Sequence, residues 1–264
     1  MTKNNVEIGI IGGTGIYDPS MIRGLKEMKI YTPFGPPSDL VYVGTYHDRK
    51  IAFVPRHGNN HQIPPHRIPY RANIWALNKL GVTRIISPGA VGSLREDYKP
   101  SEFVLVDQFI DRTKWRNDTF YEGGQVCHIS TADPFCPELR ELFMKSAINL
   151  KTVCHQRGTY ICIQGPRFST IAESKLFQSW GADVIGMTLY PEVALAKEMG
   201  ICYISIAMIT DYDVWTDKRV STAEIMKTME KNVENFKQIV VNTIPKIPKN
   251  RHCSCKNSLK EAII

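Results

Sequence analysis

The sequence "VEIGIIGGTGIYD", residues 6–18, passes from a short apolar run into a glycine-rich turn. A β-strand that ends in such a turn commonly opens an α/β domain that binds a nucleotide or a phosphate. The dinucleotide fingerprint fails, because Asp18 stands where its third glycine would be, and the chain has no Gly-Lys pair for a P-loop. The turn still offers backbone N–H groups and the Thr14 hydroxyl, which suit a lone oxyanion such as orthophosphate. A tight turn without a ligand is the alternative.

Short apolar, β-branched runs alternate with helical patterns along the rest of the chain. Several runs are continuously apolar, which is typical of central strands covered on both faces. Three helical patterns end in glycine, and Ser221 with Glu224 forms a capping-box pattern. We therefore expect an α/β fold, a single domain over residues 1–264 with a central, mostly parallel mixed β-sheet flanked by helices. The expected strands lie within residues 6–11, 40–46, 51–58, 83–93, 103–111, 158–167, 182–188 and 201–213, and the expected helices within residues 66–81, 137–150, 170–181, 191–200 and 221–244.

The composition argues against several classes of protein. The formal charge of +7 is dispersed and densest in the tail, residues 245–264. No nucleic-acid-binding signature accompanies this charge, so we expect no nucleic-acid partner. No apolar run approaches the roughly 18 residues of a membrane span, and we expect a soluble, cytoplasmic protein without a membrane partner. The seven cysteines include no pair of C-x-x-C knuckles, so their spacing predicts no metal site.

Polar side chains gather where predicted strands end. Arg56 and His57 follow an apolar run, and a guanidinium is a preferred partner of phosphate oxygens, although an ordinary surface pair is the alternative. Asp211 and Asp213 follow another run, and alternation puts them on the same side if the strand continues. Paired carboxylates at a strand end are candidates for acid–base work, with solvated loop acids as the alternative. Further candidates are the small residues 87–93, the Thr188 hydroxyl and the Phe168 ring.

Residues 111–137 break the alternation of strands and helices. They are polar and aromatic, with little periodicity. A loop this long in a compact domain is usually functional or lies at an interface.

Motifs spread over nearly the whole chain resemble the 5′-methylthioadenosine phosphorylases, a trimeric branch of the purine nucleoside phosphorylase family, and above all their thermophilic archaeal members. Their number and order make the resemblance specific. The matching motifs are GGTG around Thr14, RHG from Arg56, and residues 70–77 (YRANIWAL), 92–96 (GSLRE), 107–113 (DQFIDRT), 127–129 (CHI), 134–136 (PFC), 165–169 (GPRFS), 187–188 (MT), 191–193 (PEV) and 211–213 (DYD).

This resemblance implies a reaction, a co-substrate and an assembly. The family splits the N-glycosidic bond of 5′-deoxy-5′-methylthioadenosine with orthophosphate, which yields adenine and 5-methylthioribose 1-phosphate for purine and methionine salvage. It implies no cofactor, because phosphate is a co-substrate, and a homotrimer or a dimer of trimers. The implied phosphate ligands are Thr14, Arg56, His57, Thr188 and the backbone around Ala90.

The resemblance also implies the residues around the nucleoside. Phe168 and Ser169 would line the base pocket, and Met187 would lie along the ribose. Asp211 would donate a proton or hydrogen bond to purine N7, and Asp213 would accept from the 6-amino group. An ionised carboxylate accepts from an amino group but repels a 6-oxo group, so adenine nucleosides are favoured over inosine and guanosine.

The family closes the 5′ end of each site with a residue of the neighbouring subunit, and the matching residue is His128, inside the long irregular segment. Ile225 and Met226 match the apolar 5′ pocket loosely, and His61 is a further candidate contact. One position departs from the family, since Gly89 stands where a Thr or Ser normally supplies a phosphate hydroxyl.

The cysteines of the tail also match archaeal members of the family, which use disulfides although they are cytoplasmic. The resemblance implies the pairs Cys136–Cys202 and Cys253–Cys255, and the alternative is that all cysteines are reduced.

Three other functions stay open at the level of sequence. The nearest is a sibling phosphorylase that acts broadly on adenosine or on 6-oxopurine nucleosides. A nonenzymatic nucleoside-binding protein is the second, in which Gly89 would mark lost phosphate chemistry. The third is a nucleic-acid-binding protein that uses the positive charge.

Overall fold

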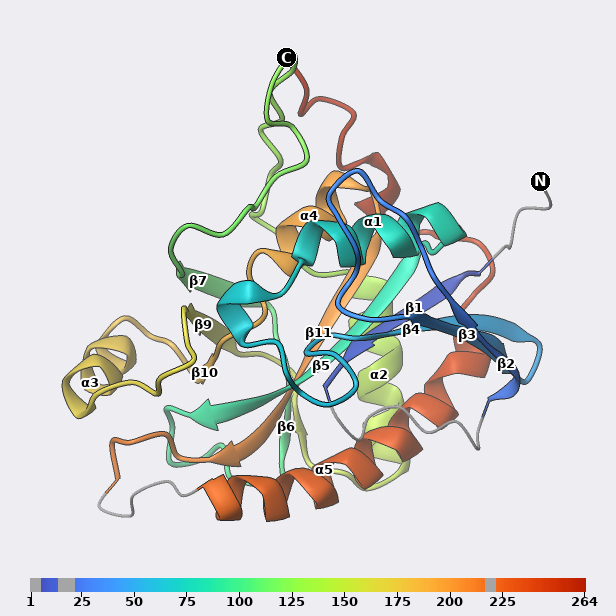
Figure 1. The fold of residues 1–264 in the computed structure, drawn as a ribbon. Coiled ribbons are helices and arrows are strands. Elements are labelled where there is room, and N and C mark those ends of the chain that lie inside the picture. The colour runs from blue at the N-terminus through green and yellow to red at the C-terminus, as the bar shows by residue number, and fades with distance from the viewer. Residues whose placement is uncertain (1–5, 14–21, 217–221) are drawn as a thin grey trace.

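An eleven-stranded sheet with helices on both sides forms the protein, which we describe from a computed structural model over residues 6–13, 22–216 and 222–264 (Figure 1). This arrangement confirms the expected α/β fold with a mixed central sheet. The strands are β1 (Ile8–Gly12), β2 (Arg23–Met28), β3 (Val41–Tyr46), β4 (Arg49–Pro55), β5 (Arg84–Ser93), β6 (Phe103–Leu105), β7 (Gln108–Arg112), β8 (Cys154–His155), β9 (Thr159–Ile163), β10 (Val184–Gly186) and β11 (Cys202–Asp211). The α-helices are α1 (Tyr70–Leu80), α2 (Pro137–Asn149), α3 (Ile171–Ser179), α4 (Glu192–Glu198) and α5 (Thr222–Thr243).

The centre of the sheet is parallel. Strand β1 lies between β4 and β5 and runs parallel to both, and β11 runs parallel to β5 on the far side. Antiparallel pairs occur farther out, where β3 joins β2 and β4, and where β10 joins β5 and β6 joins β11. Because β1, β4, β5 and β11 are parallel neighbours, their carboxyl ends meet at one edge, where open α/β sheets bind ligands.

The helices bury their apolar faces against opposite sides of this sheet (Figure 1). One core packs α1 and α4 against the sheet through residues such as Leu77 and Val193, and the other packs α2 and α5 through Phe143 and Phe236. A smaller cluster seats α3 beside β9 and β10 through Phe177. A strand covered on both faces has apolar residues at successive positions, which explains the continuous apolar runs in the sequence.

Glycines end three of the helices as the sequence predicts. Gly81, Gly181 and Gly200 follow α1, α3 and α4 with φ angles of 96°, 78° and 62°, a left-handed conformation that glycine adopts without steric cost. A capping box is present at the start of α3, where Thr170 and Glu173 satisfy each other's backbone N–H groups. The capping box predicted at Ser221 lies outside the described residues.

Two parts of the sheet differ from the prediction. The single apolar run at residues 103–111 divides into β6, which pairs with β11, and β7, which pairs with β9. Strands β2 and β8 have no signal in the sequence, because β2 is mostly exposed at an edge and β8 has only two residues. Pairing with a neighbouring strand stabilises both of them, and local sequence does not report such pairing.

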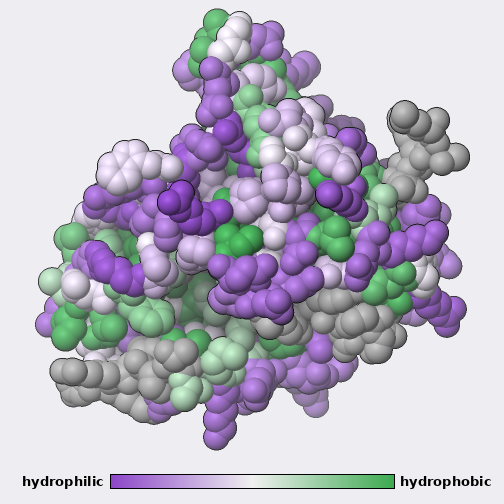
Figure 2. All heavy atoms as spheres, viewed as in Figure 1, coloured by the Kyte–Doolittle hydropathy of each residue, from purple (hydrophilic) through white to green (hydrophobic). Residues whose placement is uncertain are grey.

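The outer surface is largely hydrophilic on the face drawn in Figure 2, where hydrophobic residues floor a recess between the α3 region and the middle of the molecule. Among the described residues, no helix combines the length and the apolar character that a membrane crossing needs.

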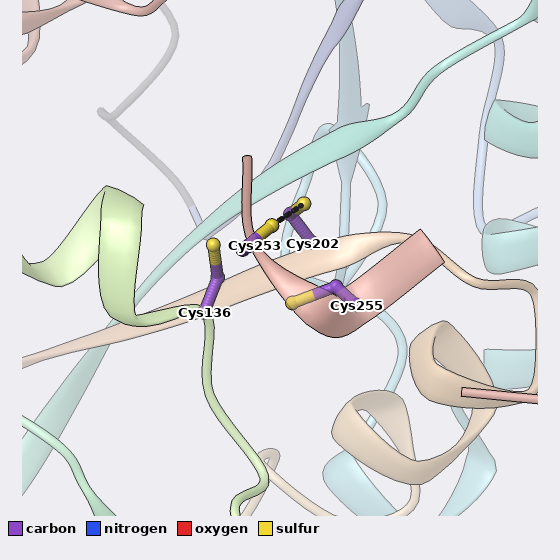
Figure 3. Close-up of side chains that lie close together, drawn as sticks. All are labelled: Cys136, Cys202, Cys253 and Cys255. Carbon is purple, nitrogen blue, oxygen red and sulfur yellow. Dashed lines mark hydrogen bonds between the residues drawn. The ribbon is translucent and has the colours of Figure 1, made fainter. Parts of the chain in front are cut away.

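The cysteine pairing implied by the resemblance is not found. All seven cysteines are free, and neither Cys136–Cys202 nor Cys253–Cys255 forms a bridge. Instead, the Sγ atoms of these four residues lie within 4.8 Å of one another, with Cys202 and Cys253 3.3 Å apart (Figure 3). That separation is well above the roughly 2.05 Å of a disulfide bond.

Candidate active site

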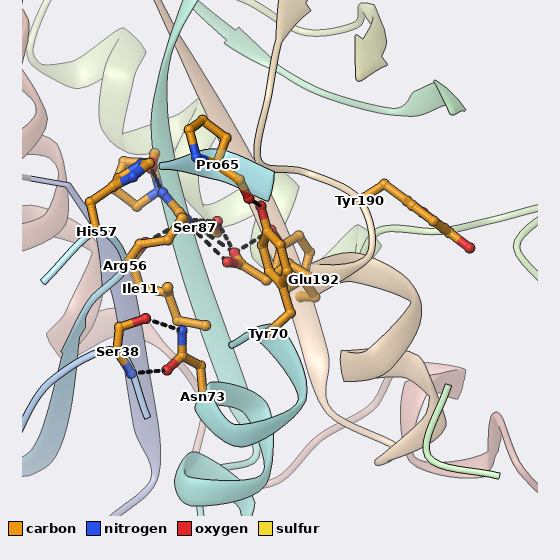
Figure 4. A network of polar contacts seen from close by, with 12 residues as sticks. Ile11, Ser38, Arg56, His57, Pro65, Tyr70, Asn73, Ser87, Tyr190 and Glu192 are labelled. Carbon is orange, nitrogen blue, oxygen red and sulfur yellow. Dashed lines mark hydrogen bonds and ion pairs between the residues drawn. The ribbon is translucent and has the colours of Figure 1, made fainter. Parts of the chain in front are cut away.

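Arg56 lies at the carboxyl end of the parallel strands, directly after β4. Its backbone N–H donates to Gly12 O at 2.9 Å, which joins the end of β4 to the end of β1. The residue is 2% exposed, and its side chain turns inward past β1 toward β5 (Figure 4). There it donates to Ser87 Oγ at 2.6 Å and to Pro88 O at 3.1 Å.

A buried carboxylate holds this guanidinium. Glu192, the first residue of α4, is 1% exposed and accepts from Arg56 Nε at 2.8 Å and from Nη2 at 3.0 Å. Its Oε1 also accepts from Ser87 Oγ at 2.6 Å and from Tyr203 Oη at 2.8 Å. A buried ion pair is stable only when further hydrogen bonds satisfy both groups, and these hydroxyls supply them.

Sequence reasoning gave Glu192 no role, although the residue stands inside one of the matching motifs. The available signal was an acidic side chain followed by four apolar residues, 193–196, at the start of a helix and directly after a strand-end segment. Such a group is rarely buried unless it is paired. Its partner, Arg56, lies 136 residues away in the chain, so only the fold brings the two together.

The hydrogen bonds of Arg56 leave one direction free for a ligand. A guanidinium has five N–H donors. The Nε hydrogen and both Nη2 hydrogens point to Glu192, Ser87 and Ile11 O, and one Nη1 hydrogen points to Pro88 O. Among the described residues, none accepts the second Nη1 hydrogen, so Arg56 is a positive charge in fixed orientation with a single available donor.

The next residue, His57, is held as a neutral ring. Its Nδ1 lies 2.8 Å from Ile63 O, and a carbonyl only accepts, so the hydrogen sits on Nδ1. Burial lowers the pKa of His57 to about 4, with the charge of Arg56 acting in the same direction and the Ile63 carbonyl opposing it. The His61 ring stacks on it at 4.4 Å. Near neutral pH, His57 therefore presents Nε2 as an acceptor, which fits the O–H of a hydrogen phosphate ion.

Gly89 and Ala90 follow Ser87 and Pro88, the two β5 residues that contact Arg56. Among the described residues, a Cβ on Gly89 would have only Thr188 Oγ1 within contact distance, at 3.8 Å, and Ala90 is exposed. The Thr188 hydroxyl, which follows β10, therefore faces the strand where the predicted phosphate site lies. The position is roomy, so the missing side chain at Gly89 is not a packing requirement.

Asp211 is the last residue of β11, and burial raises the pKa of its carboxyl group. A bulge at Thr210 shifts the register, so that Asp211 lies opposite Gly92 of β5. Thr210 Oγ1 is within hydrogen-bond distance of Val91 O, at 3.2 Å, and of Asp211 Oδ2, at 2.7 Å. The hydroxyl donates to Asp211 Oδ2 or to Val91 O, and its hydrogen bond to Asp211 opposes the rise in pKa that burial causes.

Asp213 lies beside Asp211, but strand alternation, which we expected to place it there, is not the reason. The strand ends at Asp211, and Asp213 adopts a φ of 51° in the following turn. Its N–H donates to Asp211 Oδ1 at 2.7 Å, and its buried carboxylate accepts from Ser169 Oγ at 2.8 and 2.6 Å. The two acids and Ser169 thus form one connected group.

Gly92 fixes the spacing of these acids. A Cβ on this residue would lie 3.0 Å from Asp211 Oδ1 and 3.1 Å from Asp213 Cβ. Gly89 and Gly92 are three residues apart, which is about 10 Å along an extended strand. The phosphate-binding candidates and the acids therefore stand at two positions along β5, about 10 Å apart.

Two other candidates from the sequence lie at the same edge of the sheet. Phe168 is 52% exposed, so its ring is open to a ligand. Met187 packs against Gly165, three residues before Phe168, where an added Cβ would lie 2.5 Å from Met187 Sδ.

His128 lies apart from all of these residues. It is exposed in the irregular segment between β7 and α2, and its N–H donates to Ala262 O at 2.7 Å. Figure 1 shows this green segment projecting from the body together with the C-terminus. Arg116 anchors the base of the segment by donating to Gln164 O at 2.9 Å and to Tyr70 Oη at 3.1 Å. The prediction of a long irregular segment is thereby confirmed.

Three candidates add little. Thr14 lies outside the described residues, so its predicted contact with phosphate stays a prediction. Met226 is 57% exposed on α5, near its start, and Ile225 lies beside it.

A cavity of about 270 Å³ occurs elsewhere, among residues that include Phe34, Tyr70 and Arg116, and it contains none of the predicted ligands.

Comparison with known proteins places these observations in a family. Residues 7–245 match the phosphorylase superfamily. The chain is 58% identical to the S-methyl-5′-thioadenosine phosphorylase of Thermofilum pendens and 52% identical to that of Pyrococcus horikoshii, with 98% of this chain and 99% of each relative covered.

Solved structures agree in fold. A methylthioadenosine phosphorylase from an antarctic soil metagenomic library superposes with a TM-score of 0.95 at 40% identity, covering 99% of this chain and 93% of that one. The methylthioadenosine phosphorylase of Schistosoma mansoni in complex with adenine has a TM-score of 0.91 at 36% identity, covering 97% and 96%.

Proposed function

This chain belongs to the S-methyl-5′-thioadenosine phosphorylases of the phosphorylase superfamily, and on that premise we propose how its strand-end site performs the phosphorolysis. The reaction converts 5′-deoxy-5′-methylthioadenosine and orthophosphate into adenine and 5-methylthioribose 1-phosphate, which enter purine and methionine salvage. The observation that supports these roles is the division of the site along β5, with fixed cationic and hydroxyl groups at one end and two acids, the partly buried Asp211 and the buried Asp213, at the other.

Phosphate binds at the Arg56 end. The free Nη1 hydrogen of Arg56 donates to one oxygen, and Nε2 of the neutral His57 accepts from the hydroxyl of hydrogen phosphate. Thr188, the backbone around Ala90 and the predicted ligand Thr14 complete the site. These contacts hold the nucleophile below C1′, and such positioning replaces a bimolecular encounter by an oriented one. Phosphate is then the co-substrate, and no cofactor takes part.

The purine leaves from the Asp211 end. A phosphate oxygen bonds to C1′ as the C1′–N9 bond breaks, and the electron pair of that bond moves onto the purine. Protonated Asp211 delivers its hydrogen to N7, which neutralises the charge that develops there. Asp213, held by Ser169, accepts from the 6-amino group and disfavours a 6-oxo purine. Phe168 stacks on the base, and Met187 lies along the ribose.

We further propose a homotrimer, alone or paired into a dimer of trimers, in which His128 closes the 5′ end of a neighbour's site. The support is the position of His128, exposed on a projecting segment away from the acids of its own chain. Trp115 in the same segment is 97% exposed, which is unusual for a large aromatic side chain and typical of interfaces. We propose a cytoplasmic location for this assembly, as in the sequence-based expectation.

A substrate panel tests the specificity part of the proposal. Purified protein is mixed with phosphate and with methylthioadenosine, adenosine or inosine in turn, and base release is followed. We expect the highest kcat/KM for methylthioadenosine, lower values for adenosine and the lowest for inosine. Equal or faster cleavage of inosine would contradict the role assigned to Asp213.

A further inference from the structure

Four cysteines from three distant segments converge on the side of the sheet that α2 and α5 cover (Figure 3). Cys136 precedes the first residue of α2, Cys202 begins β11, and Cys253 and Cys255 come from the C-terminal tail. All four Sγ atoms lie within 4.8 Å of one another. Cys136 and Cys202 are 1% and 0% exposed, so the group is closed to solvent on the domain side.

This geometry is close to that of a metal site. A tetrahedral zinc ion with Zn–S bonds of 2.3 Å separates its sulfur ligands by about 3.8 Å. The observed Cys202–Cys253 separation is 3.3 Å and the largest is below 4.8 Å, so displacements of less than an ångström per sulfur would admit the ion. A disulfide would instead bring two of the sulfurs to roughly 2.05 Å from each other, much closer than the separation observed here.

A helix end and a cation can stabilise negative charge in this group of cysteines. Cys136 is the N-cap of the thirteen-residue helix α2, whose N-terminal end stabilises a thiolate. The Lys197 ammonium of α4 interacts electrostatically with Cys255. A tetrathiolate zinc centre carries a net charge of about −2, which this helix end and this cation partly balance.

We propose that Cys136, Cys202, Cys253 and Cys255 form a tetrathiolate site for a zinc-class divalent cation, which fastens the C-terminal tail to the domain. Each thiol that is protonated beforehand releases its proton on binding, so affinity falls at acidic pH. No oxidant is needed, since the sulfurs keep their oxidation state. The spacing of the cysteines did not predict this site, because two ligands come from separate elements and the tail pair is C-x-C.

The proposed site also acts on the projecting segment that carries His128. The tail already contacts the domain through Arg251, which donates to Gly200 O at 2.6 Å, and through Ser258, which donates to Lys197 O at 2.6 Å. Beyond the cysteines, it pairs with residues 126–128, where Cys127 lies opposite Ile263 and the His128 N–H reaches Ala262. A metal that fixes residues 253 and 255 therefore helps to fix the last residues of the tail, against which this segment lies.

Metal analysis of the whole protein is the first test. The chain is produced in zinc-supplemented medium and purified without oxygen or chelator, and zinc and thiols are counted after denaturation. We expect about one zinc per chain and seven thiols once the metal is removed. The variants Cys136→Ser and Cys255→Ser should lose the zinc, and the control Cys154→Ser, which removes a cysteine outside the group, should keep it.

Cobalt binding provides a second readout that does not depend on the folding of the variants. Unsubstituted protein is reduced, stripped with a chelator and titrated with Co²⁺. We expect intense visible absorption from thiolate ligands that saturates near one equivalent and disappears when Zn²⁺ is added. Three thiols with no metal, which means two disulfides, would overturn the proposal. Absence of the cobalt spectrum, or zinc retained by both serine variants as an adventitious ion only, would also overturn it.

Discussion

Arg56 and Glu192 define the proposed site at the scale of single residues. The pair is almost fully buried, and the carboxylate occupies donors of the guanidinium that a free surface arginine would offer to phosphate. The arginine that the sequence suggested as a phosphate ligand is therefore an oriented charge with one open N–H. The sequence predicted that polar residues such as Arg56 follow the strands. It did not predict that four groups distant in sequence would meet around Arg56, because burial of a charge depends on the whole fold.

Replacing Glu192 by Gln should weaken phosphate binding more than nucleoside binding. The amide keeps the volume but removes the charge that orients Arg56, and breaking a buried pair also costs about 3–5 kcal/mol of stability. We expect KM for phosphate to rise at least about tenfold, with a smaller change in KM for methylthioadenosine. The matched control is Glu198→Gln on the same helix, whose carboxylate binds Thr119 and Phe120 instead. An equal effect of both substitutions on phosphate would contradict the role of Glu192.

Replacing Asp211 by Asn should lower kcat by about 10²–10⁴, because the amide cannot deliver a proton to N7. Burial raises the pKa of Asp211 and the charge of Asp213 adds to this, so kcat should fall as pH rises through that raised pKa. A pH profile of kcat measures this fall.

In Asp213→Asn the fall should persist at a lower pH, because a neighbouring negative charge is gone, while the preference for adenine nucleosides weakens. A profile unaffected by Asp211→Asn would show that another group is the acid.

Strand β5 is the element that organises the site. It carries Ser87 toward Arg56, Gly89 toward Thr188, and Gly92 against the two acids. The sequence predicted this strand and most helices well, because continuous apolar runs and glycine stops report local structure. The bulge at Thr210 and the end of β11 were not predictable, since they depend on the register between β11 and β5.

Introducing a hydroxyl at Gly89 should strengthen phosphate binding. Among the described residues, a Cβ there meets only Thr188 Oγ1, at 3.8 Å, so none of these neighbours obstructs a serine. A hydrogen bond to a charged group is worth about 1.5–3 kcal/mol, and we expect Gly89→Ser to lower KM for phosphate by about tenfold. The control is Gly92→Ser on the same strand, where the added Cβ would collide with Asp211 and Asp213 and lower kcat. Steady-state kinetics at varied phosphate concentration measure this KM, and an unchanged KM in Gly89→Ser would contradict the prediction.

At the scale of the molecule, the projecting segment links the fold to the proposed assembly. Irregular residues in the middle of the chain and the last residues of the tail hold each other away from the body, and His128 is exposed between them. The sequence predicted that this segment is irregular. Its pairing with the C-terminus, more than 130 residues away, arises only in the folded chain.

Mixing two inactive variants tests whether each site is shared between chains. His128→Ala lacks the residue that closes the neighbour's site, and Asp211→Asn lacks the acid of its own site. In trimers assembled from equal amounts of both chains, about a quarter of the sites combine an intact acid with an intact neighbouring His128. We therefore expect recovery of roughly that fraction of activity after co-expression. Activity no higher than that of the variants alone would contradict a shared site.

The dependence of base release on phosphate tests the central claim most directly. Purified protein is incubated with methylthioadenosine in phosphate and in a phosphate-free buffer, and adenine and sugar phosphate are both quantified, with Asp211→Asn as control. We expect adenine and 5-methylthioribose 1-phosphate in equal amounts when phosphate is present, and no adenine without it. Adenine released equally in phosphate-free buffer, or no adenine with phosphate present, would show that the protein is not a phosphorylase.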